Sequence, residues 1–425
     1  MTTIVLFLTF VILLLLNVPI AITLGLSSLA ALMVENIDFI VVPMNVYAAT
    51  SKFVLLAIPF FILGGNIMER AGISSRLIQL AEAFVGHLKG GMAMVVVLVA
   101  TFFAAISGSG PATVAALGMI LIPAMAKTGY SKEFSSALMA TSGAIGVIIP
   151  PSITFVVYGS IAGASIGTLF VAGLAPGILM GLGMAVVALL VGRKLNLKTL
   201  EKASTKMRWK AFREAFWGLL MPVIILGGIY GGIFTPTEAA AVSAVYGLIV
   251  GIFVYKSITM KDLYGLLIDS TSQTAVVMLI TATASLFAWV ITVSGIGEAI
   301  STMFIDVTGG STIIFFIIVN IILIIAGAFL DSTSALYIFT PLFLPVAMAL
   351  GIDLVHLGVV MIVNLAIGLV TPPVGVNLYV ACGIGEVNLS KISKAAMPLI
   401  IMALIVLLIV TYIPEVSLFL TTLMG

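Results

Sequence analysis

Long apolar runs separated by short polar turns dominate the chain, and their lengths predict membrane-spanning helices. A helix needs about 20 apolar residues to cross the hydrocarbon core of a bilayer, and many runs reach or approach that length. The split of the first run at Asn17 to Pro19 leaves a first span that is short for a bilayer. The pattern predicts ten spans, over residues 3–16, 18–34, 53–69, 134–163, 167–192, 215–234, 237–255, 270–293, 358–385 and 396–415.

Two further apolar stretches, residues 91–126 and 311–350, are interrupted halfway by small and polar residues. The interruptions are Ser-Gly-Ser-Gly at 107–110 and Asp-Ser-Thr-Ser at 331–334. Irregular backbone at membrane depth is tolerated only where it is buried in protein or lines a cavity. We therefore expect two re-entrant helical hairpins with enclosed tips.

A mixed pattern of apolar and charged positions at helical spacing occupies residues 73–87 and 296–307, directly before the hairpins. This pattern predicts arm helices that lie in the membrane interface, although ordinary surface connectors remain an alternative. Thr235 to Glu238 has the form of a helix start, with proline at the first helical position and a Thr-x-x-Glu capping box.

A Gly followed by a Pro-Pro pair interrupts two apolar segments, at residues 146–152 and again 222 positions later at 368–375. The same offset relates Pro123 to Pro345 and Pro176 to Pro398. Two copies of an interrupted segment in an apolar chain indicate a secondary transporter built from inverted-topology repeats. We expect a first repeat at 1–192, a basic cytoplasmic loop at 193–214 and a second repeat at 215–425.

Composition supports this class, because 62% hydrophobic and 8% charged residues with a mean hydropathy of +1.33 exclude a water-soluble domain. Eight of the eighteen Lys and Arg residues lie between Arg193 and Arg213, and the predicted topology places seventeen inside the cell. Lys52 alone falls outside. The net charge of +2, distributed in this way, is inconsistent with a nucleic-acid surface. The single cysteine, Cys382, excludes an intrachain disulfide.

The predicted interruptions carry the candidate chemistry. Carbonyl groups freed from helical hydrogen bonding, together with nearby hydroxyls, can form a compact oxygen shell for Na⁺. The first copy offers Ser107, Ser109, Gly143, Gly146, Val147 and Pro150, and the second offers Gly327, Asp331, Ser332, Ser334, Gly368, Thr371 and Val374.

An anionic substrate is expected beside these two cation sites. The half-helices that follow the Pro-Pro pairs begin near Ser152 and Gly375, and helix N-termini attract carboxylates. Asn377 follows directly and completes the candidate substrate-binding set.

Other interpretations of these segments stay open. Pro-Pro pairs can simply kink a helix, and Gly and Ser can serve close helix packing. Asp331, an acid in a long apolar stretch, can bind a cation, face the substrate or cap the hairpin tip. A stand-alone Na⁺- or H⁺-coupled carboxylate carrier and a structural membrane subunit are alternative functions. An intramembrane enzyme is not expected, since no HExxH, paired-aspartate or Ser-His pattern occurs within the spans.

The ordered motifs resemble those of the large membrane subunit of tripartite ATP-independent periplasmic (TRAP) transporters, over nearly the whole chain. They are ISGSGPATVAALG from 106, SGAIGVIIPPS from 142, GGIFTPTEAAAVSAVYG from 231, FLDSTSALYIFTPLFLP from 329 and NLAIGLVTPPVGVN from 364.

The resemblance implies a Na⁺-driven elevator-type transporter of the bacterial inner membrane, with a separate small four-helix membrane subunit and a periplasmic substrate-binding protein as partners. It implies an organic acid as substrate, of the C4-dicarboxylate or sialic acid class. The family's Na⁺ positions correspond by motif to Ser107 with residues 146–150, and to Gly327, Gly368, Thr371 and Val374.

Overall fold

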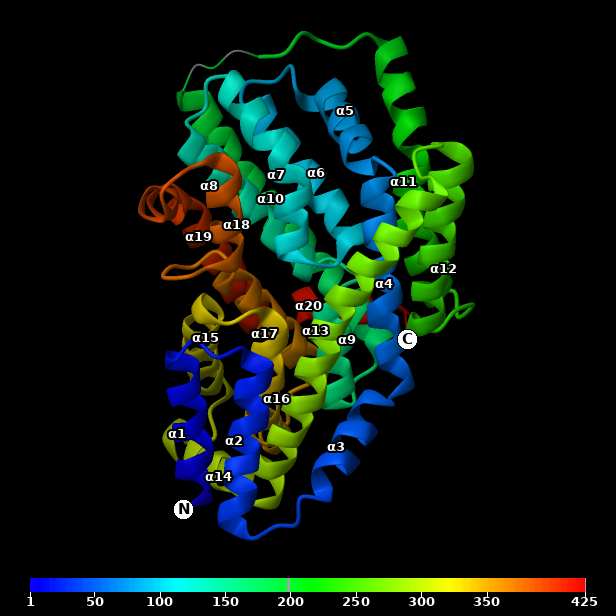
Figure 1. Cartoon of the computed structure of the whole chain (residues 1–425). Coiled ribbons are helices and arrows are strands. Elements are labelled where there is room, and N and C mark those ends of the chain that lie inside the picture. The colour runs from blue at the N-terminus through cyan, green and yellow to red at the C-terminus, as the bar shows by residue number, and fades with distance from the viewer. Residues whose placement is uncertain (196, 198, 425) are drawn as a thin grey trace.

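The computed structural model describes residues 1–195, 197 and 199–424 (Figure 1). Regular structure in these residues is entirely helical, and nine of the helical segments are long and apolar enough to cross a membrane. The predicted all-α polytopic membrane fold is thereby confirmed. Lys198, one of the eight basic residues of the predicted loop, lies outside the described residues.

The first half of the chain contains ten α-helices and two short 3₁₀ segments. The predicted division near Asn17 is present, where a positive φ of 62° ends one helix before Pro19 starts the next. The elements are α1 (Thr2–Leu15), α2 (Ile20–Glu35), α3 (Val41–Thr50), η1 (Phe53–Leu56), α4 (Ala57–Arg70), α5 (Ile73–Val85), α6 (Gly91–Ser107), α7 (Gly110–Lys127), α8 (Lys132–Gly143), η2 (Ala144–Val147), α9 (Ile153–Ala162) and α10 (Ile166–Lys194).

The second half contains ten further α-helices and one π-helical segment, η3. The predicted capping box opens α12, with the Thr235 N–H donating to Glu238 and the Glu238 N–H donating to the Thr235 hydroxyl. The elements are α11 (Thr205–Tyr230), α12 (Pro236–Ile249), η3 (Val250–Val254), α13 (Met260–Val293), α14 (Ile296–Thr308), α15 (Thr312–Phe329), α16 (Ser332–Ala349), α17 (Leu354–Gly368), α18 (Val376–Gly385), α19 (Leu389–Tyr412) and α20 (Glu415–Met424).

Two of these helices begin about ten residues before the predicted spans. The side chain of Ser204 caps α11 and a Thr259–Asp262 capping box starts α13, so both helices extend through charged turns that an apolar pattern does not include. The short helices α3 and α20 were not predicted. The helices predicted at residues 73–87 and 296–307 are present as α5 and α14.

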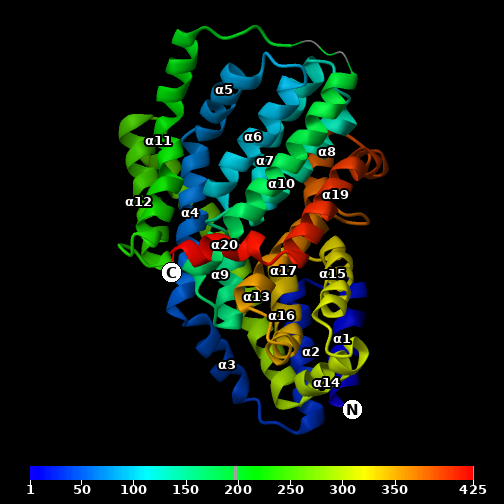
Figure 2. The ribbon, with the colours of Figure 1, turned by 180° about the vertical axis from the view of Figure 1, so that it is seen from behind.

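The helices form two groups that pack along one seam. The frame comprises α1 to α4 with α11 to α13, in which α13 contacts α2, α3 and α4, and α4 contacts α12. The core bundle comprises α6 to α10 with α15 to α19. Seen from behind, α20 crosses the middle of the molecule and packs on α10 and α17 (Figure 2).

Both predicted hairpins are present, and they approach the middle of the molecule from opposite ends. In Figure 1, α6 and α7 occupy the upper half, and α15 and α16 the lower half. The predicted interrupted helices are present as α8–η2–α9 and α17–α18. Each half exchanges contacts with the other, because α9 packs on α16 while α18 packs on α7 and α8. This exchange brings both tips and both breaks together.

Candidate functional site at the hairpin tips

The first hairpin tip is a compact cluster of oxygen atoms. Helix α6 ends at Ser107, Gly108 takes a left-handed conformation with φ of 60°, and α7 begins at Gly110. The Ser107 hydroxyl lies 2.7 Å from the Thr113 hydroxyl and 3.2 Å from the Ser109 carbonyl oxygen. Thr113 also donates to that carbonyl at 2.8 Å. Three oxygens, two of them at predicted positions, thus face one another.

The first break packs directly on this tip. A Cβ on Gly146 would lie 2.9 Å from both the Ser109 carbonyl oxygen and the Thr113 hydroxyl, so glycine permits the approach. The freed Val147 carbonyl accepts hydrogen bonds from the Ser152 hydroxyl at 2.7 Å and the Thr154 hydroxyl at 2.9 Å. The first break therefore packs Gly146 on the hairpin tip and presents its Val147 carbonyl to two hydroxyl groups.

The second hairpin tip is capped by Asp331. Its carboxylate accepts from the Ser334 N–H at 3.1 Å and from the Ser334 hydroxyl, and so closes the first turn of α16. The capping alternative for this acid is confirmed. The neighbouring Ser332 hydroxyl is buried without a hydrogen-bond partner among the described residues. An unpaired buried hydroxyl is costly, which marks Ser332 as a candidate contact for cargo.

The second break packs on the second hairpin through backbone. The N–H groups of Val374 and Gly375 both donate to the Ala328 carbonyl at 3.2 Å. A Cβ on Gly368 would lie 2.5 Å from the Gly327 Cα. The two glycines therefore let this hairpin and the broken helix approach more closely than side chains would allow.

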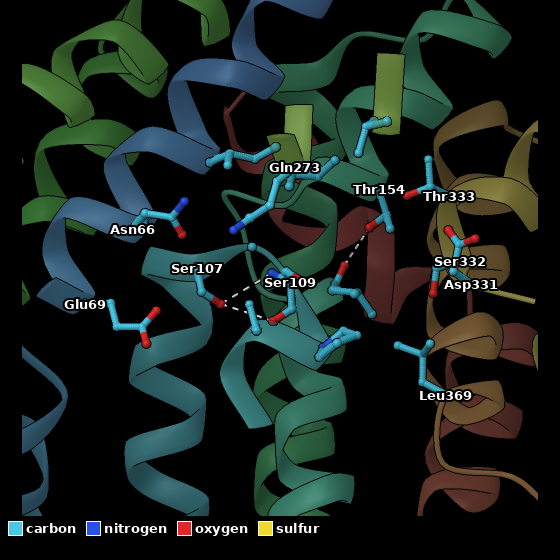
Figure 3. Close-up of a pocket in the computed structure, with 18 residues that line it drawn as sticks. Asn66, Glu69, Ser107, Ser109, Thr154, Gln273, Asp331, Ser332, Thr333 and Leu369 are labelled. Carbon is cyan, nitrogen blue, oxygen red and sulfur yellow. Dashed lines mark hydrogen bonds between the residues drawn. The ribbon is translucent and has the colours of Figure 1, made fainter. Parts of the chain in front are cut away.

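A cavity of about 180 Å³ lies where the tips and breaks meet the frame (Figure 3). Five predicted residues line it, and the frame adds polar side chains from α4 and α13. The predicted lining residues are Ser107, Ser109, Val147, Asp331 and Ser332; the lining residues that sequence reasoning missed include Asn66, Glu69, Thr154, Gln273 and Thr333.

The remaining predicted residues lie outside the lining of this cavity. Thr371 donates its hydroxyl to the Ile367 carbonyl at 2.7 Å. Asn377 is fully buried, donates its amide to the Ala140 carbonyl at 3.1 Å and leaves Oδ1 without a described partner. This group comprises Gly143, Gly146, Pro150, Ser152, Gly327, Ser334, Gly368, Thr371, Val374, Gly375 and Asn377.

Electrostatically, the cavity combines helix N-termini with two acids. The first residues of α9 and α16, Ile153 and Ser332, line it, and so does Pro111 in the first turn of α7. Such termini carry partial positive charge. Among the described residues that line the cavity, the charged ones are Glu69 and Asp331. The cavity thus places the partial positive ends of three helices beside two acidic side chains, a combination that suits an anion together with a cation.

The cavity continues toward the end of the molecule where α11 begins. A larger hollow of about 600 Å³ shares Asn66, Glu69 and Gln273 with it and adds Asp269 and Arg70. Arg70 forms an ion pair with Asp262 at this mouth. The basic segment predicted to be cytoplasmic lies at the same end, so the cavity opens toward the predicted inside (Figure 1).

A family profile described as the DctM component of tripartite ATP-independent periplasmic transporters matches residues 7–416. This chain belongs to that family. The predicted resemblance to the large TRAP membrane subunit is confirmed.

Similar TRAP permeases carry names for different small anions. The C4-dicarboxylate permease DctM of Rhodobacter capsulatus is 41% identical, with 100% of both chains covered. The isethionate permease DctMQ of Oleidesulfovibrio alaskensis is 44% identical over 98% of this chain and 66% of its own. The sialic acid permease SiaM of Vibrio cholerae is 36% identical over 95% of both chains.

Among solved structures, the YdaH transporter of Alcanivorax borkumensis matches 91% of this chain and 88% of its own. The TM-score is 0.64 at 15% sequence identity, so the two chains share a fold.

Proposed function

We propose that this chain is the large permease subunit of a Na⁺-driven TRAP transporter that imports a small organic acid across the bacterial inner membrane. A periplasmic binding protein delivers the acid, and a small four-helix membrane subunit completes the complex. No reaction is catalysed. The observation that carries the proposal is the meeting of two hairpin tips and two broken helices around one polar cavity between the frame and the core bundle.

Na⁺ as co-transported cargo is supported by the donor chemistry. Hard cations prefer oxygen ligands, and carbonyl oxygens can replace the hydration shell of an ion. The first copy supplies the Ser107 and Thr113 hydroxyls with the Ser109 carbonyl, within 3.2 Å of one another. The second copy supplies Asp331, the carbonyls of its break and the Ser332 hydroxyl, which has no hydrogen-bond partner among the described residues. We assign at least one Na⁺ to each copy.

The substrate class follows from charge. An anion in the cavity meets the partial positive ends of α7, α9 and α16 but also Glu69 and Asp331. Bound Na⁺ offsets these acids, so an anion and Na⁺ favour each other's binding. The named relatives transport small organic anions, and the C4-dicarboxylate permeases are represented in three bacteria at 41–43% identity. We therefore propose a C4-dicarboxylate before sialic acid.

An elevator movement of the core bundle against the frame accounts for alternating access. The reciprocal packing of α9 on α16 and of α18 on α7 ties the two halves of the bundle together, which supports their movement as one body built from two inverted repeats. The frame contributes one wall of the cavity through α4 and α13. Sliding the bundle along this wall would carry the cavity from one side of the membrane to the other.

Uptake of labelled succinate and labelled sialic acid into proteoliposomes tests the proposal. The vesicles contain this chain with its small subunit, and the binding protein and an inward Na⁺ gradient are each supplied or omitted. Accumulation of succinate that needs both supports the proposal. Sialic acid accumulation alone would overturn the substrate class, and uptake without Na⁺ or without the binding protein would overturn the coupling or the tripartite mechanism.

A further inference from the structure

A second cavity lies along the seam between frame and core bundle, at the end opposite to the open mouth. Its volume is about 310 Å³. The frame lines it with α3, η1 and α13, and the core bundle with α9 and α16. Its polar side chains include Asn45, Lys52, Ser160, Thr281, Ser285 and Tyr337. This outer cavity lies on the predicted external side of the protein.

Among the described residues that line the outer cavity, Lys52 is the one with a charged side chain. Its ammonium donates to the Ser160 carbonyl at 2.8 Å, across the seam from the frame to the last turn of α9. A carbonyl accepts this hydrogen bond without neutralising the charge, and the ion pairs of the described residues do not include Lys52. The outer cavity therefore carries a net positive charge, at the one basic residue that the sequence places outside.

A buried hydrogen bond separates the outer cavity from the hairpin tips. The Tyr337 hydroxyl on α16 donates to the Thr281 hydroxyl on α13 at 2.8 Å. Val277, one turn earlier on α13, already lines the cavity at the tips. This hydrogen bond joins the core bundle to the frame, and so does the hydrogen bond between Lys52 and Ser160. Both contacts cross the seam, so sliding of the bundle along the frame must break them and release the ammonium.

The charges along the seam favour inward passage of an anion. The outer cavity holds Lys52, whereas the inner mouth holds Glu69 and Asp269 beside an Arg70–Asp262 pair. A positively lined cleft raises the local concentration of anions and their association rate. An acidic mouth disfavours their retention.

We infer that the outer cavity is a first binding site for the carboxylate of the substrate, and that Lys52 is the residue that binds this carboxylate. The inference rests on the proposed function, because it takes the incoming cargo to be an organic anion. The Lys52 ammonium pairs with a carboxylate once the Ser160 contact is broken. Displacement of Tyr337 from Thr281 then opens the path to the cavity at the hairpin tips.

Three variants test the role of the charge: Lys52→Gln, Lys52→Arg and the control Lys391→Gln, which removes an exposed lysine at the start of α19. We expect Lys52→Gln to raise the KM for succinate about five- to tenfold with kcat nearly unchanged, and Lys52→Arg and the control to resemble the wild type. Added salt raises the KM of the wild type by screening and leaves that of Lys52→Gln unchanged.

Two results would overturn the inference. One is a KM for Lys52→Gln equal to that of the wild type. The other is a loss of kcat and thermal stability in both Lys52 variants, which would mean that the lysine only holds the end of α9. A thermal-shift titration of the purified complex with succinate separates this inference from the proposed function. Weaker succinate binding by Lys52→Gln supports the inference even if uptake proves independent of Na⁺.

Discussion

The Thr113 hydroxyl joins the oxygens of the first hairpin tip, although its position in the sequence did not single it out. It lies 2.7 Å from the Ser107 hydroxyl and donates to the Ser109 carbonyl at 2.8 Å. It is fully buried on α7. A cation bound at this tip would use oxygens whose positions depend on Thr113.

Replacing Thr113 with valine keeps the shape of the side chain and removes this oxygen. Lost hydrogen bonds of this kind cost about 0.5–1.5 kcal/mol, so we expect the half-saturating Na⁺ concentration of uptake to rise roughly two- to tenfold. Thr113→Ser retains the hydroxyl and should behave as the wild type. A Na⁺ titration of initial uptake rates measures the shift, and identical titrations for all three proteins would contradict a Na⁺ site at this tip.

Ser332 offers the opposite case, a buried hydroxyl that lacks a described partner at the cavity wall. Its removal in Ser332→Ala should leave thermal stability unchanged or slightly higher, because an unpaired buried hydroxyl destabilises the fold. Uptake should weaken, with KM for substrate or Na⁺ raised roughly fivefold, as a lost contact of about 1 kcal/mol implies.

Ser136→Ala is the matched control for this residue. Ser136 is also buried and unpaired among the described residues, but it does not line the cavity at the hairpin tips. We expect normal uptake from it. Equal uptake by the two variants would mean that Ser332 serves only in packing and does not contact substrate or Na⁺.

At the scale of elements, close backbone contact is what assembles the site. Helix α17 meets α15 where Gly368 faces Gly327, and η2 meets the first hairpin where Gly146 faces Ser109. At Gly368 the nearest atoms are all backbone atoms of Gly327, and at Gly146 they are the Ser109 carbonyl and the buried Thr113 hydroxyl. Each break therefore approaches its hairpin to a distance that only glycine permits.

Gly368→Ala would place a Cβ 2.5 Å from the Gly327 Cα. We expect a loss of about 1–3 kcal/mol of stability and nearly complete loss of uptake, because the break must separate from the hairpin. Gly383→Ala is the control on α18, where an added Cβ meets nothing within 4 Å. Alanine there should be neutral or stabilising by about 0.5–1 kcal/mol. Thermal unfolding and uptake measure both, and unchanged uptake by Gly368→Ala would refute the close contact.

At the scale of the whole molecule, the seam between frame and core bundle carries hollows at its two ends. Ser272 lines the inner mouth and Asn45 lines the outer cavity. Both lie on frame helices, so their accessibility reports the two ends of the seam.

Single cysteines at these positions, in a Cys382→Ser background, should react with a membrane-impermeant maleimide from opposite sides. We expect Ser272→Cys to be labelled in inside-out vesicles and Asn45→Cys in right-side-out vesicles. Labelling is read as a mass shift on intact protein. Reaction of both cysteines from the same side would contradict the topology, and omission of the reagent provides the background.

The sequence determined the helical spans, both hairpins and both breaks. Lipid offers no hydrogen-bond partners, so each backbone N–H and C=O group in the membrane must be paired within the protein. The length of an apolar run therefore predicts a helix, and the polar residues that interrupt the run predict where the helix ends. Gly, Pro and the capping residues mark those ends locally. The predictions failed mainly at α11 and α13, where caps outside the apolar runs start the helices.

The tertiary structure alone decided which side chains share a cavity. Glu69, Gln273 and Thr154 are polar residues on mostly apolar helices, and the side each one faces depends on contacts with helices distant in the chain. The second hairpin meets α9 of the first half, and α18 meets α7. These contacts join residues more than 150 positions apart, so periodicity along a single helix contains no record of them.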